Sequence, residues 1–188
     1  MPVATWWRGD PLPALPPIPR LTVRRVTRWD EARQITGLTE VRVVARFQDG
    51  NSLYAAFLDS EPAGYGWLAR QAGRIDELAL TFEVRHGEAY LWDFVTLPSF
   101  RGRGVYPHLL QAILRAEDRS RFWIGYEGHN LASARGIEKA GFQVVGDLAI
   151  EAATSGLLTV TGVTLTDGSG ERGRAFADLL GLPVVSEA

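Results

Sequence analysis

The spacing of apolar residues divides the chain into short segments of two kinds. Strict alternation predicts a strand with one buried face, whereas apolar residues three and four positions apart predict one face of a helix. In the first half of the chain these patterns predict a strand from Leu21, a short helix from Trp29 to about Gly37, and a hairpin of residues 53–58 and 64–70. Residues 76–84 alternate most regularly, so we predict a half-buried strand there.

The second half of the chain repeats the order strand, turn, helix. Residues 89–97 are largely apolar on both faces, as expected for a central strand covered on both sides, and a helical pattern begins at Val105. A second unit runs from a strand at residues 122–126 into a helix that ends at Gly141, where glycine can adopt the left-handed cap. Further patterns predict strands near residues 142–150 and 157–166 and, although Gly173 weakens it, a helix at 171–180.

The N-terminal segment has a different composition. Five prolines lie between Pro11 and Pro19, and each removes an amide donor, so we expect an extended strap outside the sheet. The strap leads from Trp6 and Trp7, which either pack on the domain surface or mark a contact with a partner. The sequence leaves both interpretations open.

Composition narrows the class of protein. The chain has 188 residues, 46% of them hydrophobic, which is enough for one sizeable core. Its formal net charge is −2 and its 20 Lys and Arg residues are scattered, so we expect neither nucleic acid nor a membrane as a partner. Without an apolar run of about 18 residues or the layout of a signal peptide, a cytoplasmic protein is expected. The absence of cysteine excludes disulfides and an acyl-cysteine intermediate, and the wide spacing of the histidines argues against a metal.

The turn at residues 101–106 has the features of a phosphate-binding site. Binding a pyrophosphate requires inward-facing amides, glycines where a Cβ would block approach, and a helix N-terminus behind them. Arg101 and Arg103 add donors suited to phosphate oxygens. The turn lacks the Gly-Lys-Ser/Thr of a P-loop and the third glycine of a dinucleotide fingerprint.

Two segments resemble the GCN5-related N-acetyltransferase (GNAT) family. Residues 94–104 are similar to its acetyl-CoA segment, whose pattern is Arg/Gln-x-x-Gly-x-Gly/Ala after a central strand, with Arg101 and Gly104 in the matching positions. Residues 130–142 resemble its second segment, with the same spacing from Asn130 to Gly141-Phe142. The sequence departs from the family at Tyr106, where a small residue is usual, and at Ile137, where many relatives carry a tyrosine thought to protonate the departing thiolate.

The resemblance implies an α/β (α+β) fold, with a mixed, mostly antiparallel sheet flanked by helices and splayed between its two central strands. It implies a domain at residues 20–166, between an N-terminal extension (1–19) and a C-terminal one (167–188). It also implies acetyl-CoA as co-substrate, with backbone amides around Val95 to Leu97 at the thioester oxygen. The residues expected to bind it are Val95, Leu97, Arg101, Gly102, Arg103, Gly104, Val105, Tyr106, Asn130 and Ser133.

Asp93 and Glu127 are the candidate catalytic residues, because the amine that attacks the thioester must first lose a proton. Asp93 lies in an otherwise apolar strand, where burial requires either a pairing partner or a raised pKa, so it is either an acceptor for arginine or backbone donors or a base. Glu127 either relays a proton through water or is an ordinary surface carboxylate. Asn130 as a helix cap and Ser133 within its helix also have purely structural explanations.

The expected activity is therefore transfer of an acetyl group to a primary amine of a small molecule or peptide. Two alternatives stay open. One is a module of the same fold that senses acyl-CoA without turning it over, and the other is a protein-interaction domain in which Trp6, Trp7 and the proline strap dominate. The sequence predicts neither the acceptor nor the oligomeric state.

Overall fold

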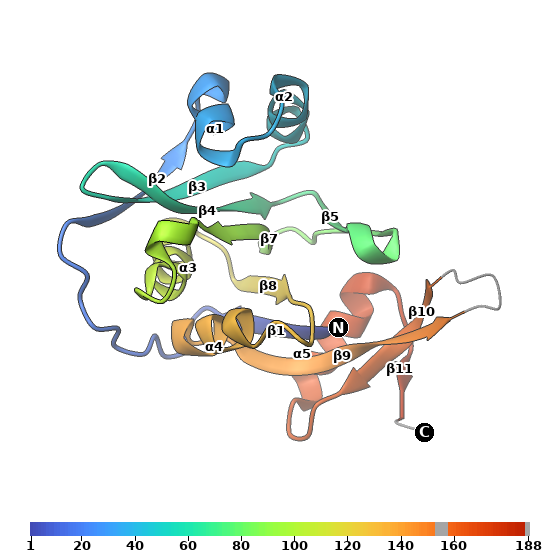
Figure 1. The fold of residues 1–188 in the computed structure, drawn as a ribbon. Coiled ribbons are helices and arrows are strands. Elements are labelled where there is room, and N and C mark those ends of the chain that lie inside the picture. Colours follow the sequence, from blue (N-terminus) through green and yellow to red (C-terminus); the bar gives the residue numbers. More distant parts are fainter. Residues whose placement is uncertain (153–157, 187–188) are drawn as a thin grey trace.

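The computed structural model describes residues 1–152 and 158–186, which form one large sheet covered by helices (Figure 1). The strands of the sheet are β1 (Pro2–Trp7), β2 (Leu21–Val26), β3 (Ser52–Leu58), β4 (Glu61–Ala69), β7 (Glu88–Thr96), β8 (Arg121–Gly125), β9 (Gln143–Ala152), β10 (Leu158–Leu165) and β11 (Val184–Val185). The helices are α1 (Trp29–Thr36), α2 (Glu40–Gln48), α3 (Val105–Ala116), α4 (Leu131–Ala140) and α5 (Gly170–Leu180). A separate pair of strands, β5 (Ala72–Ile75) and β6 (Leu80–Glu83), is joined by a 3₁₀ turn, η1 (Asp76–Leu78), and a second such turn, η2 (Pro98–Phe100), follows β7.

The sheet has the order β11-β10-β9-β1-β8-β7-β4-β3-β2. Its pairs are antiparallel except for β7 with β8 and β10 with β11, which are parallel. Strands β7 and β8 pair only where residues 88–91 face residues 121–124. Beyond Leu91 the two central strands separate, although β7 continues to Thr96. The mixed, mostly antiparallel and splayed sheet is the predicted fold class.

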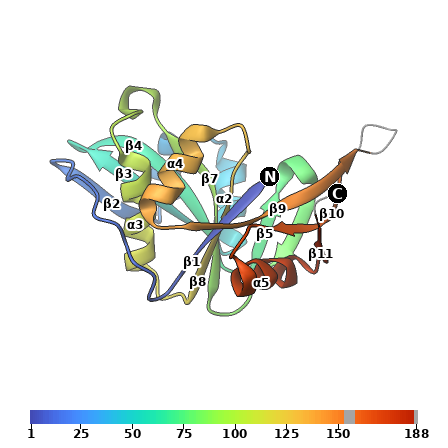
Figure 2. The same ribbon diagram turned by 90° about the horizontal axis from the view of Figure 1, so that it is seen from below.

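The sheet is buried on both faces because its strands alternate between two sets of apolar neighbours. In β3, Tyr54 and Ala56 belong to the core shared with α3 and α4, whereas Leu53, Ala55 and Phe57 face the core shared with α1 and α2. Helix α5 covers the same face as α1 and α2, over β9 and β10, so α3 and α4 lie on one side of the sheet and α5 on the other (Figure 2). No helix within the described ranges is long and apolar enough to cross a membrane.

The helices that border the site begin and end where their cap residues predict. Gly104 precedes α3 with φ 79°, a left-handed conformation that favours glycine. The Asn130 side chain caps α4 by accepting a hydrogen bond from the Ser133 amide at 3.0 Å, and Gly141 ends this helix with φ 102°.

Several sequence predictions differ from the structure. The single strand predicted for residues 76–84 is wrong, because Ala79 turns the chain with φ 48° between η1 and β6. Trp6 is neither on the surface nor free for a partner, since β1 runs between β8 and β9 and leaves Trp6 only 3% exposed. Residues 11–19 do form an extended strap outside the sheet. The elements β1, α2, β5 and β11 were not predicted, and the predicted strand start at Leu157 lies outside the described residues. The domain boundaries stay predictions.

Candidate active site

The separation of β7 from β8 opens two hollows that meet. The first, which we call the turn groove, has a volume of about 680 Å³ and lies between the end of β7, the turn before α3, and α4. The second, which we call the bulge cavity, has a volume of about 520 Å³ and lies between β7, the end of β8, η1 and α2. Four residues line both hollows, namely Phe94, Tyr106, Asn130 and Ser133.

The turn at residues 101–106 presents free amides to the turn groove. Gly102 and Gly104 have φ values of 74° and 79°, and a Cβ added at Gly102 would meet no atom within 4 Å. Among the described residues, none accepts a hydrogen bond from the backbone amides of residues 102–106. Consecutive unpaired amides at the start of a helix attract anions, because the helix dipole adds partial positive charge there.

The side chains of the turn groove add positive charge. Arg101, Arg135 and Lys139 line it, and no Asp or Glu is among its described lining residues. Arg135 and Lys139 were not among the predicted site residues. Their spacing in the sequence could have indicated a place beside the groove. Arg135 and Lys139 are four positions apart and follow Ser133 on α4, and residues at this spacing share a helix face.

Eight of the ten residues predicted to bind the cofactor line the turn groove: Val95, Arg101, Gly102, Gly104, Val105, Tyr106, Asn130 and Ser133. The other two do not. The Arg103 guanidinium lies over the Phe100 ring, 5.6 Å from its centroid. The Leu97 amide donates to the Ala63 carbonyl at 2.9 Å, so it is already paired within the sheet and cannot serve as the expected donor to a thioester.

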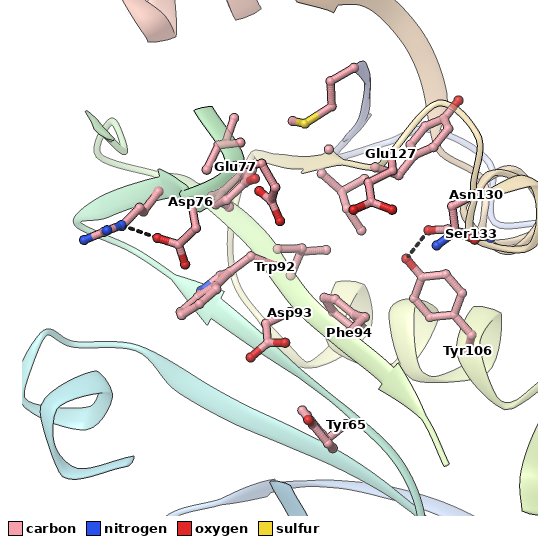
Figure 3. A pocket seen from close by; sticks show the side chains of 18 of the residues that line it. Tyr65, Asp76, Glu77, Trp92, Asp93, Phe94, Tyr106, Glu127, Asn130 and Ser133 are labelled. Atoms are coloured by element: carbon pink, nitrogen blue, oxygen red, sulfur yellow. Dashed lines mark hydrogen bonds and ion pairs between the residues drawn. The ribbon is translucent and has the colours of Figure 1, made fainter. Parts of the chain in front are cut away.

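The bulge cavity is lined by carboxylates, arginines and aromatic rings. Asp76, Glu77 and Glu127 lie on its upper side in Figure 3, and Asp93 lies below them on β7. Two of its arginines are paired, Arg74 with Asp76 and Arg46 with Asp93, so the remaining charged side chains of the lining are Arg42, Glu77 and Glu127. One arginine and two carboxylates give the bulge cavity a net negative charge, which favours a cationic ligand.

Both predicted catalytic carboxylates line this cavity. Asp93 accepts a hydrogen bond from Arg46 Nη1 at 2.5 Å, so it has the arginine partner that one of its two interpretations required. Glu127 follows the end of β8, is half exposed, and lies 3.1 Å from His129 Nε2. Ile137, by contrast, is 1% exposed within the core and does not line either hollow.

Tyr106 forms the wall between the two hollows. Its ring packs on Phe94, with 5.5 Å between centroids, and against Gly136, where an added Cβ would lie 2.4 Å from Cδ1 of the tyrosine. Its hydroxyl is 3.5 Å from Ser133 Oγ. Burial raises the pKa of this hydroxyl above its ordinary value of 10.0, and the weaker effect of Ser133 is in the opposite direction. Tyr106 is therefore protonated at neutral pH.

Within residues 1–152 and 158–186, no group of three or more His, Asp or Glu side chains is arranged to hold a metal ion. The chemical groups that the described residues bring to the site include carboxylates, arginines, a tyrosine and backbone amides. An anionic ligand fits the turn groove, a cationic ligand fits the bulge cavity, and the two would meet beside Phe94 and Tyr106.

Comparison with known proteins gives a family and a fold. The family model described as Acetyltransferase (GNAT) family matches residues 18–142. A GCN5-related N-acetyltransferase from Kribbella flavida has a TM-score of 0.50 at 15% identity, over 76% of this chain and 53% of that one. A GNAT-family acetyltransferase from Novosphingobium aromaticivorans DSM 12444 has a TM-score of 0.50 at 16% identity, over 76% of this chain and 59% of that one.

A third solved structure, the aminoglycoside N-acetyltransferase AAC(6')-Iy in complex with CoA, has a TM-score of 0.49 at 18% identity, over 65% of this chain and 91% of that one. At these identities the first two structures show the fold alone, and the chain spans about half the length of the Kribbella flavida protein. A search of curated proteins found no significant match.

Proposed function

Because this chain belongs to the GNAT family of acetyltransferases, we propose that it is an acetyl-CoA-dependent N-acetyltransferase acting on a primary amine by direct attack, with both substrates bound. One observation carries the proposal. A groove with free amides and positive charge meets a cavity with excess carboxylates, and the junction holds a protonated tyrosine.

The turn groove suits the cofactor. The amides of Gly102 to Tyr106 would hold the pyrophosphate, with Arg101, Arg135 and Lys139 around the phosphates, while the exposed edge of β7 at Val95 and Thr96 would lie along the rest of the molecule. When bound, acetyl-CoA would supply a thioester acetyl group, so that a C–N bond forms to the amine as the C–S bond breaks. CoA would leave as a thiolate that takes a proton from solvent, and the nitrogen would lose its second proton to solvent.

The bulge cavity suits the amine. A primary amine has a pKa of about 10 and arrives as an ammonium ion, which Glu77 and Glu127 attract. A base must then remove a proton. Asp93 is occupied by Arg46, whereas Glu127 is open to solvent beside the junction, so we assign Glu127 the role of accepting the proton, through water.

Tyr106 lies where the turn groove and the bulge cavity meet. A free thiol has a pKa of about 8.5, well below that of a buried tyrosine, so Tyr106 would not give up its proton to a thiolate. It can still donate a hydrogen bond to the sulfur as negative charge develops there. That role does not require the tyrosine that many relatives carry at the position of Ile137.

The test pairs two variants with similar backbone strain. Gly104→Asp places a side chain and a negative charge at the amides of the turn, and we expect it to abolish the rise in melting temperature that acetyl-CoA gives the wild-type chain. Gly37→Asp is the control, because Gly37 has φ 70°, no neighbour within 4 Å of an added Cβ, and a place outside the groove. Wild-type binding in Gly104→Asp would refute this placement of the pyrophosphate.

Release of free thiol on mixing acetyl-CoA with amines, diamines, amino acids and peptides separates the candidate functions. Turnover supports the transferase, whereas binding without thiol release supports an acyl-CoA sensor. If acetyl-CoA does not bind, a protein-interaction domain is the remaining candidate function. The structure favours it less, because Trp6 is buried and the guanidinium groups of Arg121 and Arg172 pack on the Trp7 ring.

A further inference from the structure

Strand β7 contains a β-bulge where it borders the bulge cavity. Val95 pairs with Tyr65 and Trp92 with Trp67, so Asp93 and Phe94 together face the single residue Gly66. Asp93 has φ 50°, a left-handed conformation that residues with a Cβ rarely adopt. Asp adopts it more readily than most such residues, and a contact from outside the strand can fix Asp93 in this conformation.

Arg46 of α2 makes that contact. Its guanidinium lies against the indole rings of both Trp67 and Trp92, at 4.8 and 4.3 Å from their centroids, and its Nη1 is 2.5 Å from Asp93 Oδ2. The arginine side chain is only 13% exposed, so the ion pair is shielded from solvent on one side. An arginine held on two rings has little freedom to move, which makes it a rigid anchor for the Asp93 carboxylate.

The bulge decides where Phe94 lies. The Phe94 ring covers Gly66 so closely that a Cβ added there would be 2.1 Å from the ring. The same ring lines both hollows and packs on Tyr106. The residues that follow, Val95 and Thr96, form the edge of the turn groove. A change at Asp93 would thus move the junction and this edge together.

We propose that Arg46 is a positioning residue for acetyl transfer. It holds Asp93 in the left-handed conformation, and this conformation aligns Phe94 and the β7 edge with the cofactor. This inference rests on the proposed function. It gives the Asp93 carboxylate a structural role, as the group that Arg46 holds, and leaves proton removal to another group.

Substitutions at the two positions test the proposal. Arg46→Met keeps an unbranched side chain over the indoles but loses the ion pair, and we expect at least a tenfold fall in kcat/KM for acetyl-CoA. Arg46→Lys should recover part of this loss, because it restores the charge without the planar fork. Asp93→Gly leaves the Arg46 charge without its partner, but it should lose less of kcat/KM for acetyl-CoA than Arg46→Met does, since glycine adopts φ 50° without help. The double variant Arg46→Met/Asp93→Gly should be clearly more active than Arg46→Met alone.

The opposite results overturn the proposal. A catalytic base at Asp93 predicts that Asp93→Gly and Asp93→Asn both lose more than a hundredfold in kcat and alter the pH profile. Wild-type kinetics in Arg46→Met would show that the contact positions nothing. Melting temperatures measured in parallel identify a variant that is merely unfolded, and Asp93→Asn, which tolerates a left-handed backbone and still accepts from Arg46, then takes the place of Asp93→Gly.

Failure of the proposed function can be told apart from failure of this inference. If the wild-type chain binds acetyl-CoA but releases no thiol, the same order of variants is expected in the acetyl-CoA thermal shift. A wild-type enzyme whose variants do not follow this order contradicts the inference alone. A wild-type chain that neither binds acetyl-CoA nor releases thiol contradicts both.

Discussion

At the scale of single residues, Tyr106 occupies the place where the two hollows meet. It comes from the turn that resembles a phosphate-binding segment, at a position where relatives have a small residue. Gly136 on α4 provides the space that the larger ring requires. Ile137 lies in the core, so the hydroxyl beside the junction comes from Tyr106 on α3 and not from α4.

Tyr106→Phe should slow turnover without weakening acetyl-CoA binding. Phenylalanine keeps the packing on Phe94 and Gly136 but removes the hydrogen bond to the developing thiolate, which is worth about 1.5–3 kcal/mol for a charged partner. We expect kcat to fall by about tenfold to a hundredfold. Steady-state kinetics measure this, with Tyr126→Phe, on the outer wall of the bulge cavity, as the control. A wild-type kcat in Tyr106→Phe would contradict the role of the hydroxyl.

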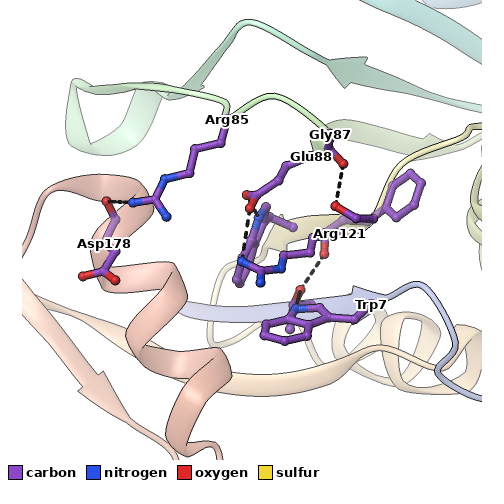
Figure 4. A network of polar contacts seen from close by, with 10 residues as sticks. Trp7, Arg85, Gly87, Glu88, Arg121 and Asp178 are labelled. Carbon is purple, nitrogen blue, oxygen red and sulfur yellow. Dashed lines mark hydrogen bonds and ion pairs between the residues drawn. The ribbon is translucent and has the colours of Figure 1, made fainter.

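At the scale of elements, the site exists because β7 and β8 are held together at one end only. The buried carboxylate of Glu88, at 5% exposure, accepts hydrogen bonds from Trp123 Nε1 at 2.6 Å and from Arg121 Nη1 at 3.3 Å (Figure 4). Ser120 Oγ donates to the Gly87 carbonyl beside them. These contacts satisfy a charge that would otherwise be costly to bury, and they join the strands at the end opposite the hollows.

The site also requires the packing of α4 on α3, and Gly136→Ala tests this requirement. Alanine in a helix interior is favoured by up to about 1 kcal/mol, but a Cβ 2.4 Å from the Tyr106 ring forces a displacement that costs about 1–3 kcal/mol. We expect a small net loss in the free energy of unfolding and a clear loss of acetyl-CoA affinity, because the ring lines the turn groove. Calorimetry and thermal shift measure the two effects.

Gly128→Ala is the matched control for that experiment. Its added Cβ would meet nothing closer than Pro2 Cδ at 3.6 Å, which is an ordinary contact. Unchanged affinity in both variants would mean that the Tyr106 ring can move without affecting the groove.

The elements predicted from the sequence are those with strong local signals. Helix α4 has its cap at Asn130 and its stop at Gly141, and β7 is largely apolar on both faces and ends at Thr96, shortly before Pro98. The alternation at residues 76–84 was misleading because a left-handed Ala79 breaks it, a conformation that alanine does not signal. Helix α2 was missed although the Thr39 hydroxyl caps it, since the valines of this helix equally favour a strand.

The candidate site was predictable only in part, because only part of it is formed by residues that are close together in the sequence. The turn groove is built largely from two continuous segments, so its motif was visible in the sequence. The bulge cavity combines side chains from η1, α2, β7 and β8, and its key pair joins Arg46 to a residue 47 positions later. No local sequence pattern predicts such a contact, because the contact depends on how elements distant in the sequence pack together.

At the scale of the whole molecule, an ion pair joins Asp10, the residue before the N-terminal strap, to helix α5. Arg172 of α5 donates to both oxygens of Asp10, at 2.6 and 2.7 Å, and lies over the Trp7 ring. This contact lowers the pKa of Asp10 below its ordinary value of 3.8. A depressed pKa adds stability above pH 3.8, and that stability is lost as the pH falls through the folded-state pKa.

Asp10→Asn should therefore destabilise the chain at pH 7, by about 1–3 kcal/mol for the lost charged hydrogen bonds. The difference between the variant and the wild type should shrink below pH 3.8, where the wild-type carboxylate also becomes neutral. Urea unfolding at several pH values measures this. Asp30→Asn, which removes the exposed pair with Arg28, should change little at any pH, and an equal effect there would show that burial of the Asp10 pair is unimportant.

The position of β1 also constrains how the protein is made. Its neighbours in the sheet, β8 and β9, start more than a hundred residues later in the chain, and the Thr5 hydroxyl donates to a carbonyl 117 positions away. The nascent chain must therefore carry an apolar strand without its partners until β8 and β9 have been synthesised. Such long-range pairing makes for slow folding and exposes the unfinished chain to aggregation, so chaperone dependence during synthesis is an expected cost of this topology.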